Sequence, residues 1–214
     1  MLNAKGIFMT EERATMQKIL DCAKEEFLDK GYSNASLRLI CKKAGVTTGA
    51  LYFFYKNKED LFRAIVDDTL NEFRTILQEF LSESFTIEAQ LETLCDDLKD
   101  IQIIKNIVHY LYQNYDVFQI LLKRSQGSIY ENITEQFVDI FEKYYERLTE
   151  KLSIEMGIRK PDKYILHWYS HIQIDAFVQL LVHEKDESKA IRYIEPLVTY
   201  LVSGWVEIFP KTTE

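Results

Sequence analysis

The segment AGVTTGALYFFYKNKEDL, from Ala44 to Leu61, decides the fold that this chain is expected to adopt. Gly45 stands where a helix can end in the left-handed backbone conformation, which glycine adopts without steric cost. Thr47 follows two residues later and belongs to the residue types that cap the start of a helix. The segment therefore predicts two short helices, at about residues 37–44 and 48–54, separated by a tight turn.

Longer helices are predicted on either side of this pair. A residue that can cap a helix N-terminus precedes each of the first four helices: Thr10, Ser36, Thr47 and Asn57. Gly31 is placed to end the first helix. Asp60 stands three residues after Asn57, close to the capping-box arrangement. The fourth helix carries apolar residues at helical spacing from Leu61 to Phe80, so we expect it to be long.

The remainder of the chain is also predicted to be helical. Apolar periodicity indicates helices at about residues 87–114, 116–125, 128–156, 162–183 and 188–208. Pro161 suits the first turn of one helix, whereas Pro196 falls inside the last helix and should kink or restart it. No stretch shows the alternation of apolar and polar residues that is typical of a strand. We therefore expect an all-α protein with two domains, residues 1–62 and residues 63–214, whose boundary falls inside the fourth helix.

The charge of the chain is unevenly distributed. Of 214 residues, 47% are hydrophobic, and the net charge is −8. Residues 1–62 carry ten Lys or Arg against eight Asp or Glu, a balance of +2, so the remaining residues carry −10. Between Lys30 and Lys58 the sequence has six basic residues and no acidic residue. This basic segment favours a polyanionic partner, although charge alone would fit a solvated surface equally well.

Nothing in the sequence indicates secretion or membrane insertion. The first ten residues contain no apolar run of signal-peptide length. The most apolar stretches, residues 164–182 and 193–209, are interrupted by polar or charged residues, so neither is expected to span a membrane. The three cysteines have no paired spacing, which is typical of a reducing compartment, and we expect the protein in the cytoplasm.

Two short helices joined by residues 44–47 and braced by a preceding helix form a helix-turn-helix unit. In such a unit the second short helix enters the major groove of DNA, and small residues such as Gly49 permit close approach. Hydroxyl and ammonium groups can bind phosphates, while Arg38 can reach a phosphate or a guanine edge. We expect the DNA contacts to be made by Ser36, Arg38, Thr47, Thr48, Gly49, Ala50, Tyr52, Phe53, Lys56 and Lys58.

The longer stretch GYSNASLRLICKKAGVTTGALYFFYKNKEDLF, residues 31–62, resembles the DNA-binding signature of the TetR (tetracycline-repressor-like) family of bacterial regulators. The matching positions are Gly31, Tyr32, Ile40, Ala44, Gly45, Val46, Gly49, Leu51, Tyr52, Lys58 and Leu61. The sequence departs from the family at Ala35, often threonine, at Cys41, often alanine, and at Tyr55, where phenylalanine is more usual. The resemblance covers residues 10–62 and implies a transcription regulator, most often a repressor. It also implies a dimer in which the last two helices of each copy pair.

The C-terminal half is expected to bind a small-molecule effector and to form the homodimer. Helix bundles leave interior pockets, where polar groups among aromatic residues could bind a ligand. Our candidates for this pocket are His109, Tyr112, Gln113, Tyr144, His171 and Asp175. The stretch 164–183 is apolar on nearly every side, so a second copy is expected to cover one face. The candidates for the dimer interface are Ile172, Ala176, Leu201 and Trp205.

His167, His171 and Asp175 follow one another at intervals of four residues along a predicted helix. This spacing could hold a metal ion, but a hydrogen bond between His171 and Asp175 is the more common arrangement. The sequence contains no nucleophile elbow, no phosphate-binding glycine loop and no Cys-x-x-Cys pair. We therefore expect no metal, no other cofactor and no catalytic site.

Three functions fit these features. The first is a dimeric transcription regulator that binds an inverted-repeat operator in duplex DNA. A small molecule would release it from the operator. The second is a DNA-architectural or accessory protein that has the same helix-turn-helix but no ligand control. The third is an all-helical enzyme that uses His167, His171 and Asp175. A ligand cavity in the C-terminal half separates the first from the second, and metal content and turnover identify the third.

Overall fold

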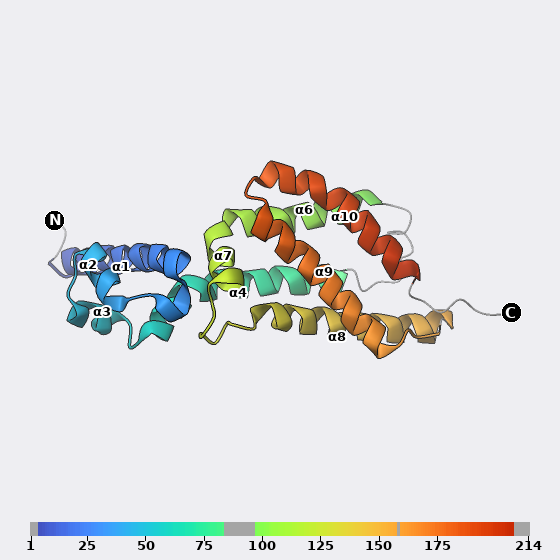
Figure 1. Cartoon of the computed structure of the whole chain (residues 1–214), viewed down its shortest axis with the longest axis horizontal. Coiled ribbons are helices and arrows are strands. Elements are labelled where there is room, and N and C mark those ends of the chain that lie inside the picture. The colour runs from blue at the N-terminus through green and yellow to red at the C-terminus, as the bar shows by residue number, and fades with distance from the viewer. Residues whose placement is uncertain (1–3, 84–96, 158, 208–214) are drawn as a thin grey trace. The chain divides into compact units, whose positions relative to one another are not determined.

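The computed structural model describes residues 4–83, 97–157 and 159–207 (Figure 1). Over these residues the chain consists of helices and contains no strand, which confirms the expected all-α fold. The helices are α1 (Ala4–Asn34), α2 (Leu37–Ala44), α3 (Thr48–Phe54), α4 (Lys58–Glu83), α6 (Asp97–Gln113), α7 (Tyr115–Lys123), α8 (Ile133–Met156), α9 (Lys163–His183) and α10 (Glu187–Glu207). The predicted helix at 87–114 therefore lies partly outside the described residues.

The chain divides into two compact units. Unit 1 is formed by the residues up to Glu72 together with Asp116–Glu131, and unit 2 by Phe73–Tyr115 and the residues from Asn132 onward. The division falls inside α4, after Glu72, whereas the boundary expected from the sequence follows residue 62. That domain boundary stays a prediction.

The capping residues of the helix-turn-helix lie where the sequence indicated. The side-chain oxygen of Ser36 accepts a hydrogen bond from the backbone N–H of Leu39 at 3.4 Å, at the start of α2. Thr47 caps α3 in the same way, and Asn57 accepts the corresponding bond at the start of α4. Because the first N–H groups of a helix have no partner within it, these side chains define where each helix begins.

Helix α1 differs from the prediction at its N-terminal end. It begins at Ala4, so Thr10 lies inside the helix and does not cap it. Apolar spacing places a helix but does not fix its first residue, and a threonine is compatible with a helix interior. Gly31 interrupts the helix as predicted, with φ of 73° and ψ of 165°, and a short continuation ends at Asn34.

The core of unit 1 is assembled from α1, α2, α3 and α4. Its fully buried side chains include Ile19, Ala23, Phe27, Ile40, Leu51, Leu61 and Phe62. The rings of Phe27 and Phe62 pack edge-to-face with their centroids 5.0 Å apart. Burial of each such side chain contributes about 1.5–3 kcal/mol, so this core fixes α2 and α3 against the two longer helices.

Residues 116–131 complete unit 1, although they are distant in the sequence. The backbone N–H of Tyr32 donates to the carbonyl of Arg124 at 2.7 Å. The hydroxyl of Ser33 donates to the carbonyl of Gln126 at 2.5 Å. These two bonds attach the end of α1 to the segment that follows α7. The domain boundary expected from the sequence instead assigned this segment to the C-terminal domain.

Gly127 lies beside this attachment with φ of 85°, and a Cβ added there would stand 2.4 Å from Oγ of Ser33. Gly157 has a similar φ of 68°, but a Cβ added there meets no atom within 4 Å. We expect Gly127→Ala to lower the free energy of unfolding by about 2–3 kcal/mol, because left-handed strain adds to the lost Ser33 bond. Gly157→Ala should cost only the strain, about 1–2 kcal/mol. Thermal unfolding measures the difference, and equal melting temperatures would contradict an attachment at Ser33.

Unit 2 packs α6 against α10 and α8 against α9, and α9 also contacts α10. The buried residues between α6 and α10 include Val108, Ala190, Ile194 and Val198. An aromatic cluster lies among α8, α9 and α10, where the ring of Tyr145 stands 4.5 Å from that of Trp205 and 5.1 Å from that of Tyr169. The phenol of Tyr169 donates to the carbonyl of Leu201 at 2.6 Å, and burial raises its pKa well above the usual value.

The starts of α8 and α9 in unit 2 differ from the prediction. Helix α8 begins at Ile133 and not at residue 128, because residues 128–132 form turns. Pro161 precedes the helix cap, which is Asp162, and so lies outside the first turn of α9. Pro196 lies inside helix α10, as the sequence indicated, and the helix does not restart there; a kink at this proline stays a prediction. Within the described residues, none of the helices has the length and apolar character needed to cross a membrane.

Candidate nucleic-acid interface

The turn between α2 and α3 determines which face of α3 is exposed. Gly45 ends α2 in the left-handed conformation, with φ of 69° and ψ of 30°, as the sequence predicted. The backbone N–H of Val46 then donates to the carbonyl of Cys41 at 3.0 Å, which closes the turn. Leu51 is the fully buried residue of α3 and points into the core of unit 1. The opposite side of α3 is therefore left exposed.

The exposed side of α3 consists of small, hydroxyl and aromatic residues: Thr48, Gly49, Tyr52 and Phe53. Phe53 is 74% exposed and Tyr52 is 54% exposed, which is unusual for side chains of this size. A Cβ added at Gly49 would meet only Oγ1 of Thr47, at 3.8 Å. A larger side chain at Gly49 would therefore not clash with the rest of the protein. Ala50, a further expected contact, is half-buried.

Two of the expected DNA contacts already serve as helix caps. The oxygens of Ser36 and Thr47 accept bonds from the backbone of α2 and α3. A hydroxyl that accepts one bond can still donate its own hydrogen. Both side chains are exposed and can therefore donate to a phosphate while they hold the helices in position.

Exposed basic residues flank the surface of α3. Arg38, Lys42 and Lys56 are exposed, and none of the three takes part in an ion pair within the described parts of the chain. Lys43, in contrast, pairs with Glu26 at 3.4 Å. The three cations are thus available to phosphates, whose contacts position a protein on DNA.

Lys58 has a different environment. Its Nζ donates to the carbonyl of Ser33 at 3.1 Å and lies 4.9 Å from the centre of the Tyr32 ring. Partial burial lowers the pKa of Lys58. The lysine thus stabilises the end of α1, a role that its position in the sequence did not indicate. Its expected contact with a phosphate stays a prediction.

Lys56 and Lys58 provide a matched pair of variants. We expect Lys56→Ala to reduce the slope of log affinity against log salt by about one unit without loss of stability, because an exposed phosphate contact is removed. Lys58→Ala should instead lower the free energy of unfolding by about 1 kcal/mol, because the Ser33 carbonyl loses its donor. Titration of a duplex at several salt concentrations and thermal unfolding test both. An unchanged slope for Lys56→Ala would contradict a phosphate contact at Lys56, and an unchanged melting temperature for Lys58→Ala would contradict its role at the end of α1.

Glu26 is a further residue of this site that sequence analysis missed. Its side chain is 2% exposed and accepts a hydrogen bond from the backbone N–H of Ser36 at 3.3 Å. Its other oxygen faces Nζ of Lys43 at 3.4 Å. The carboxylate thereby anchors the start of α2 to α1. An acidic residue on the core side of an amphipathic helix is the signal that could have identified it.

The expected ligand-pocket residues do not gather in one place. His109 contacts Glu187 through Nδ1 at 2.5 Å and Gln113 through Nε2 at 2.7 Å. Tyr112 lies on the same helix and donates to the carbonyl of Glu184 at 2.8 Å. These three residues are therefore brought together near the turn between α9 and α10.

The other three expected pocket residues lie elsewhere. Tyr144 is buried against Tyr145 in the aromatic cluster, with ring centroids 5.1 Å apart, and Asp175 is exposed. His171 faces α8, where its Nε2 stands 3.8 Å from Glu135. A hollow on the surface of unit 2 includes none of the six, since it is lined by Glu146, Arg147, Glu150, Lys151, Ile154 and Glu155. The pocket itself stays a prediction.

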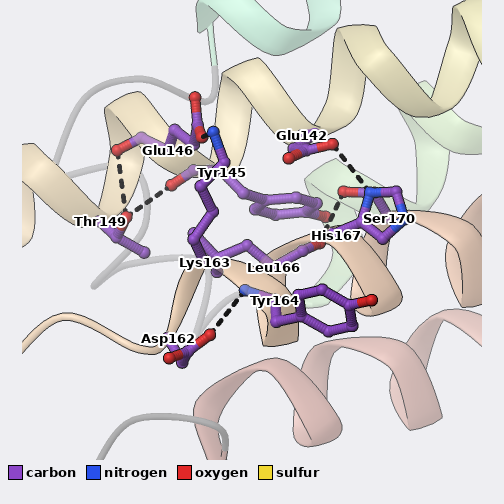
Figure 2. A network of polar contacts seen from close by, with 10 residues as sticks. All are labelled: Glu142, Tyr145, Glu146, Thr149, Asp162, Lys163, Tyr164, Leu166, His167 and Ser170. Carbon is purple, nitrogen blue, oxygen red and sulfur yellow. Dashed lines mark hydrogen bonds and ion pairs between the residues drawn. The ribbon is translucent and has the colours of Figure 1, made fainter.

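Glutamate side chains of α8 contact lysine and histidine side chains of α9 (Figure 2). Glu142 contacts Nδ1 of His167 at 3.0 Å, and Glu146 contacts Nζ of Lys163 at 2.7 Å. The expected pair between His171 and Asp175 is not formed, because α8 supplies the carboxylate. In the described residues, no group of three or more side chains has an arrangement that would hold a metal ion. The histidines thus join two helices.

The expected interface residues fall into two groups. Ile172 is 51% exposed and Ala176 is half-buried, so both lie near the surface of α9. Leu201 is buried, and Trp205 packs within the chain against Tyr145. The exposed apolar residues of α9 are instead Tyr164, Ile165, Trp168 and Ile172. Three of them recur at intervals of four residues and so share one face of the helix.

Residues 19–65 match the sequence profile of the bacterial regulatory proteins, tetR family. The chain is 30% identical over 83 residues to the fatty acid metabolism regulator protein of Bacillus subtilis (strain 168), an alignment that covers 39% of this chain and 43% of that protein. It is 49% identical over 55 residues to the HTH-type transcriptional regulator AcrR of Shigella flexneri, covering 26% of each chain. The matches thus span less than half the length of these relatives. Both relatives are named as regulators, which are not enzymes.

A solved structure resembles the chain over most of its length. It is NalD of Pseudomonas aeruginosa, described as the secondary repressor of the MexAB-OprM multidrug efflux pump. The TM-score is 0.52 at 20% identity, and the match covers 94% of this chain and 100% of NalD. At this identity the likeness shows a common fold.

Proposed function

Because the chain belongs to the TetR family of bacterial regulatory proteins, we propose that it regulates transcription by binding specific sites in duplex DNA. The observation that carries this proposal is the exposed side of α3, held outward by the buried Leu51. A helix in this position of a helix-turn-helix enters the major groove. The protein would then act in the cytoplasm, without catalytic activity of its own, and most often as a repressor.

Basic and hydroxyl groups around α3 support the DNA-binding proposal. Arg38, Lys42 and Lys56 are exposed on the same unit, and Thr47 and Ser36 retain hydroxyl hydrogens for phosphates. The segment from Lys30 to Lys58 contains no acidic residue that would repel a phosphate backbone. Such contacts position a protein on DNA, whereas the residues of α3 select the sequence.

A homodimer is proposed because the exposed face of α9 needs a partner. Trp168 is 62% exposed, and Tyr164 and Ile172 lie on the same face of the helix. Contiguous apolar surface of this kind marks an interface in proteins that dissolve in water. Two-fold symmetry in the protein requires an operator with inverted repeats.

The proposed effector is a small molecule that binds unit 2 and weakens DNA binding. The cluster of His109, Tyr112 and Gln113 supplies polar groups beside the buried residues that join α6 to α10. Helix α4 is continuous from Lys58 to Glu83, and the division between the units falls within it. A ligand that displaces α4 would change the spacing of the two α3 helices in a dimer.

Selection from a pool of random duplexes tests the proposed function. We expect enrichment of an inverted repeat, and a reporter gene placed behind that repeat should be repressed when the protein is produced. Enrichment without repression would favour the architectural or accessory function. A pool that shows no enriched sequence at moderate salt would contradict specific DNA binding altogether.

A further inference from the structure

The residues of α3 restrict how this helix can read bases. Its sequence is TGALYFF, which contains no Asn, Gln, Arg, Lys, Asp or Glu. The side chains that form paired hydrogen bonds with guanine or adenine, or that accept a bond from cytosine, come from those six residue types. Helix α3 therefore lacks every side chain of the kind that recognises a base by two hydrogen bonds. The reading must depend on another property of the major groove.

Phe53 is the more exposed of the two exposed aromatic side chains of α3. It is 74% exposed, while its neighbour Leu51 is fully buried. Its ring meets that of Phe54 edge-to-face with centroids 5.1 Å apart, so one side of the ring is supported by the protein. A large apolar ring exposed to water gains free energy when an apolar partner covers it.

The exposed basic residues of unit 1 favour DNA as the partner that covers Phe53. Arg38, Lys42 and Lys56 are exposed in the same basic segment, which contains no acidic residue. A polyanion complements this surface. The major groove presents one apolar group among its base edges, the C5 methyl group of thymine.

We propose that Phe53 reads thymine through its C5 methyl group, so that thymine is favoured at one or two positions of the half-site beneath α3. This inference rests on the proposed function and adds the chemistry by which the operator is recognised. Tyr52 and Thr48 add exposed hydroxyl groups on α3, and Arg38 on α2 carries an exposed guanidinium of the kind that binds guanine.

Replacement of thymine by deoxyuridine isolates the methyl group, because base pairing is unchanged. The probe is the duplex enriched from the random pool, with each thymine of one half-site replaced in turn. We expect replacement at one or two positions to weaken binding about fourfold each, the worth of one buried methyl-sized group. Replacement at the remaining thymines should leave the affinity unchanged.

Variants of Phe53 show whether the methyl group is read by this ring. We expect Phe53→Ala to bind the thymine and deoxyuridine duplexes equally, and both more weakly than the parent protein binds the thymine duplex. Phe53→Leu should retain part of the preference, since leucine keeps an apolar contact. Ile154→Ala is the matched control, because Ile154 is 75% exposed on α8 and should not affect either duplex.

The outcomes separate this inference from the proposed function. A pool without an enriched sequence overturns both. An enriched duplex whose affinity is unchanged by every deoxyuridine overturns thymine reading alone, and so does a Phe53→Ala variant that still prefers thymine. Because Phe53 is exposed, its replacement should leave the melting temperature unchanged, and circular dichroism verifies that each variant is folded.

Discussion

Gly49→Leu should bind the selected operator at least about a hundredfold more weakly than the parent protein, while its fold stays intact. The free protein has room for the side chain, since an added Cβ meets only Thr47 Oγ1 at 3.8 Å. A glycine inside a helix costs about 1 kcal/mol relative to alanine, so the substitution can even raise stability. On DNA, however, leucine would hold α3 away from the base edges and weaken every contact that α3 makes.

Gly49→Ala is the graded control for this prediction. It should raise the melting temperature by a similar amount but reduce affinity much less, because it adds a single methyl group. Fluorescence titration with the operator and thermal unfolding of both variants provide the comparison. If Gly49→Leu binds as tightly as the parent protein, α3 is not the helix that enters the groove.

Trp168→Glu and Ile172→Glu should dissociate the dimer, with the dimer dissociation constant raised by at least about a hundredfold. Each substitution would bury a charge without a partner in the proposed interface, which costs several kcal/mol. Both side chains are more than half exposed in the single chain, so its fold should be preserved. Operator affinity should fall with dimerisation, because one half-site alone provides half of the contacts.

Ile154→Glu is the control for the dimer. Ile154 is 75% exposed, but it stands among the charged residues Glu150, Lys151 and Glu155 of α8. An apolar residue among charges does not form a continuous apolar face, so this variant should remain a dimer. Sedimentation at micromolar concentration measures all three variants. Dimers that persist in Trp168→Glu and Ile172→Glu would exclude this face of α9.

The helix-turn-helix could be predicted in detail because its determinants are local. Ser36, Gly45, Thr47 and Asn57 each act on backbone groups within a few residues of themselves, so their identities report the structure directly. The exposure of Gly49 and Phe53 follows from the period of a helix whose buried residue is Leu51. The start of α1 was missed because no local signal marks it.

The remaining features depend on contacts between distant segments. Arg124 and Gln126 bind the end of α1 through backbone carbonyls, and a carbonyl is present at every residue. The sequence therefore carries no distinctive sign of this attachment. In the same way, Glu135 and Glu142 lie opposite the histidines of α9 only once α8 packs against it. The pocket residues were chosen by type, and residue type does not determine which helices meet.

In the proposed complex, two copies of α3 bind neighbouring major grooves on one side of the operator. The most direct measurement compares the selected inverted repeat with the same duplex lengthened by five base pairs between its half-sites. The five added base pairs are about half a helical turn, so the two half-sites then lie on opposite sides of the DNA. We expect the lengthened duplex to bind at least about a hundredfold more weakly, close to the affinity of a single half-site. Equal affinity for the two duplexes would contradict it.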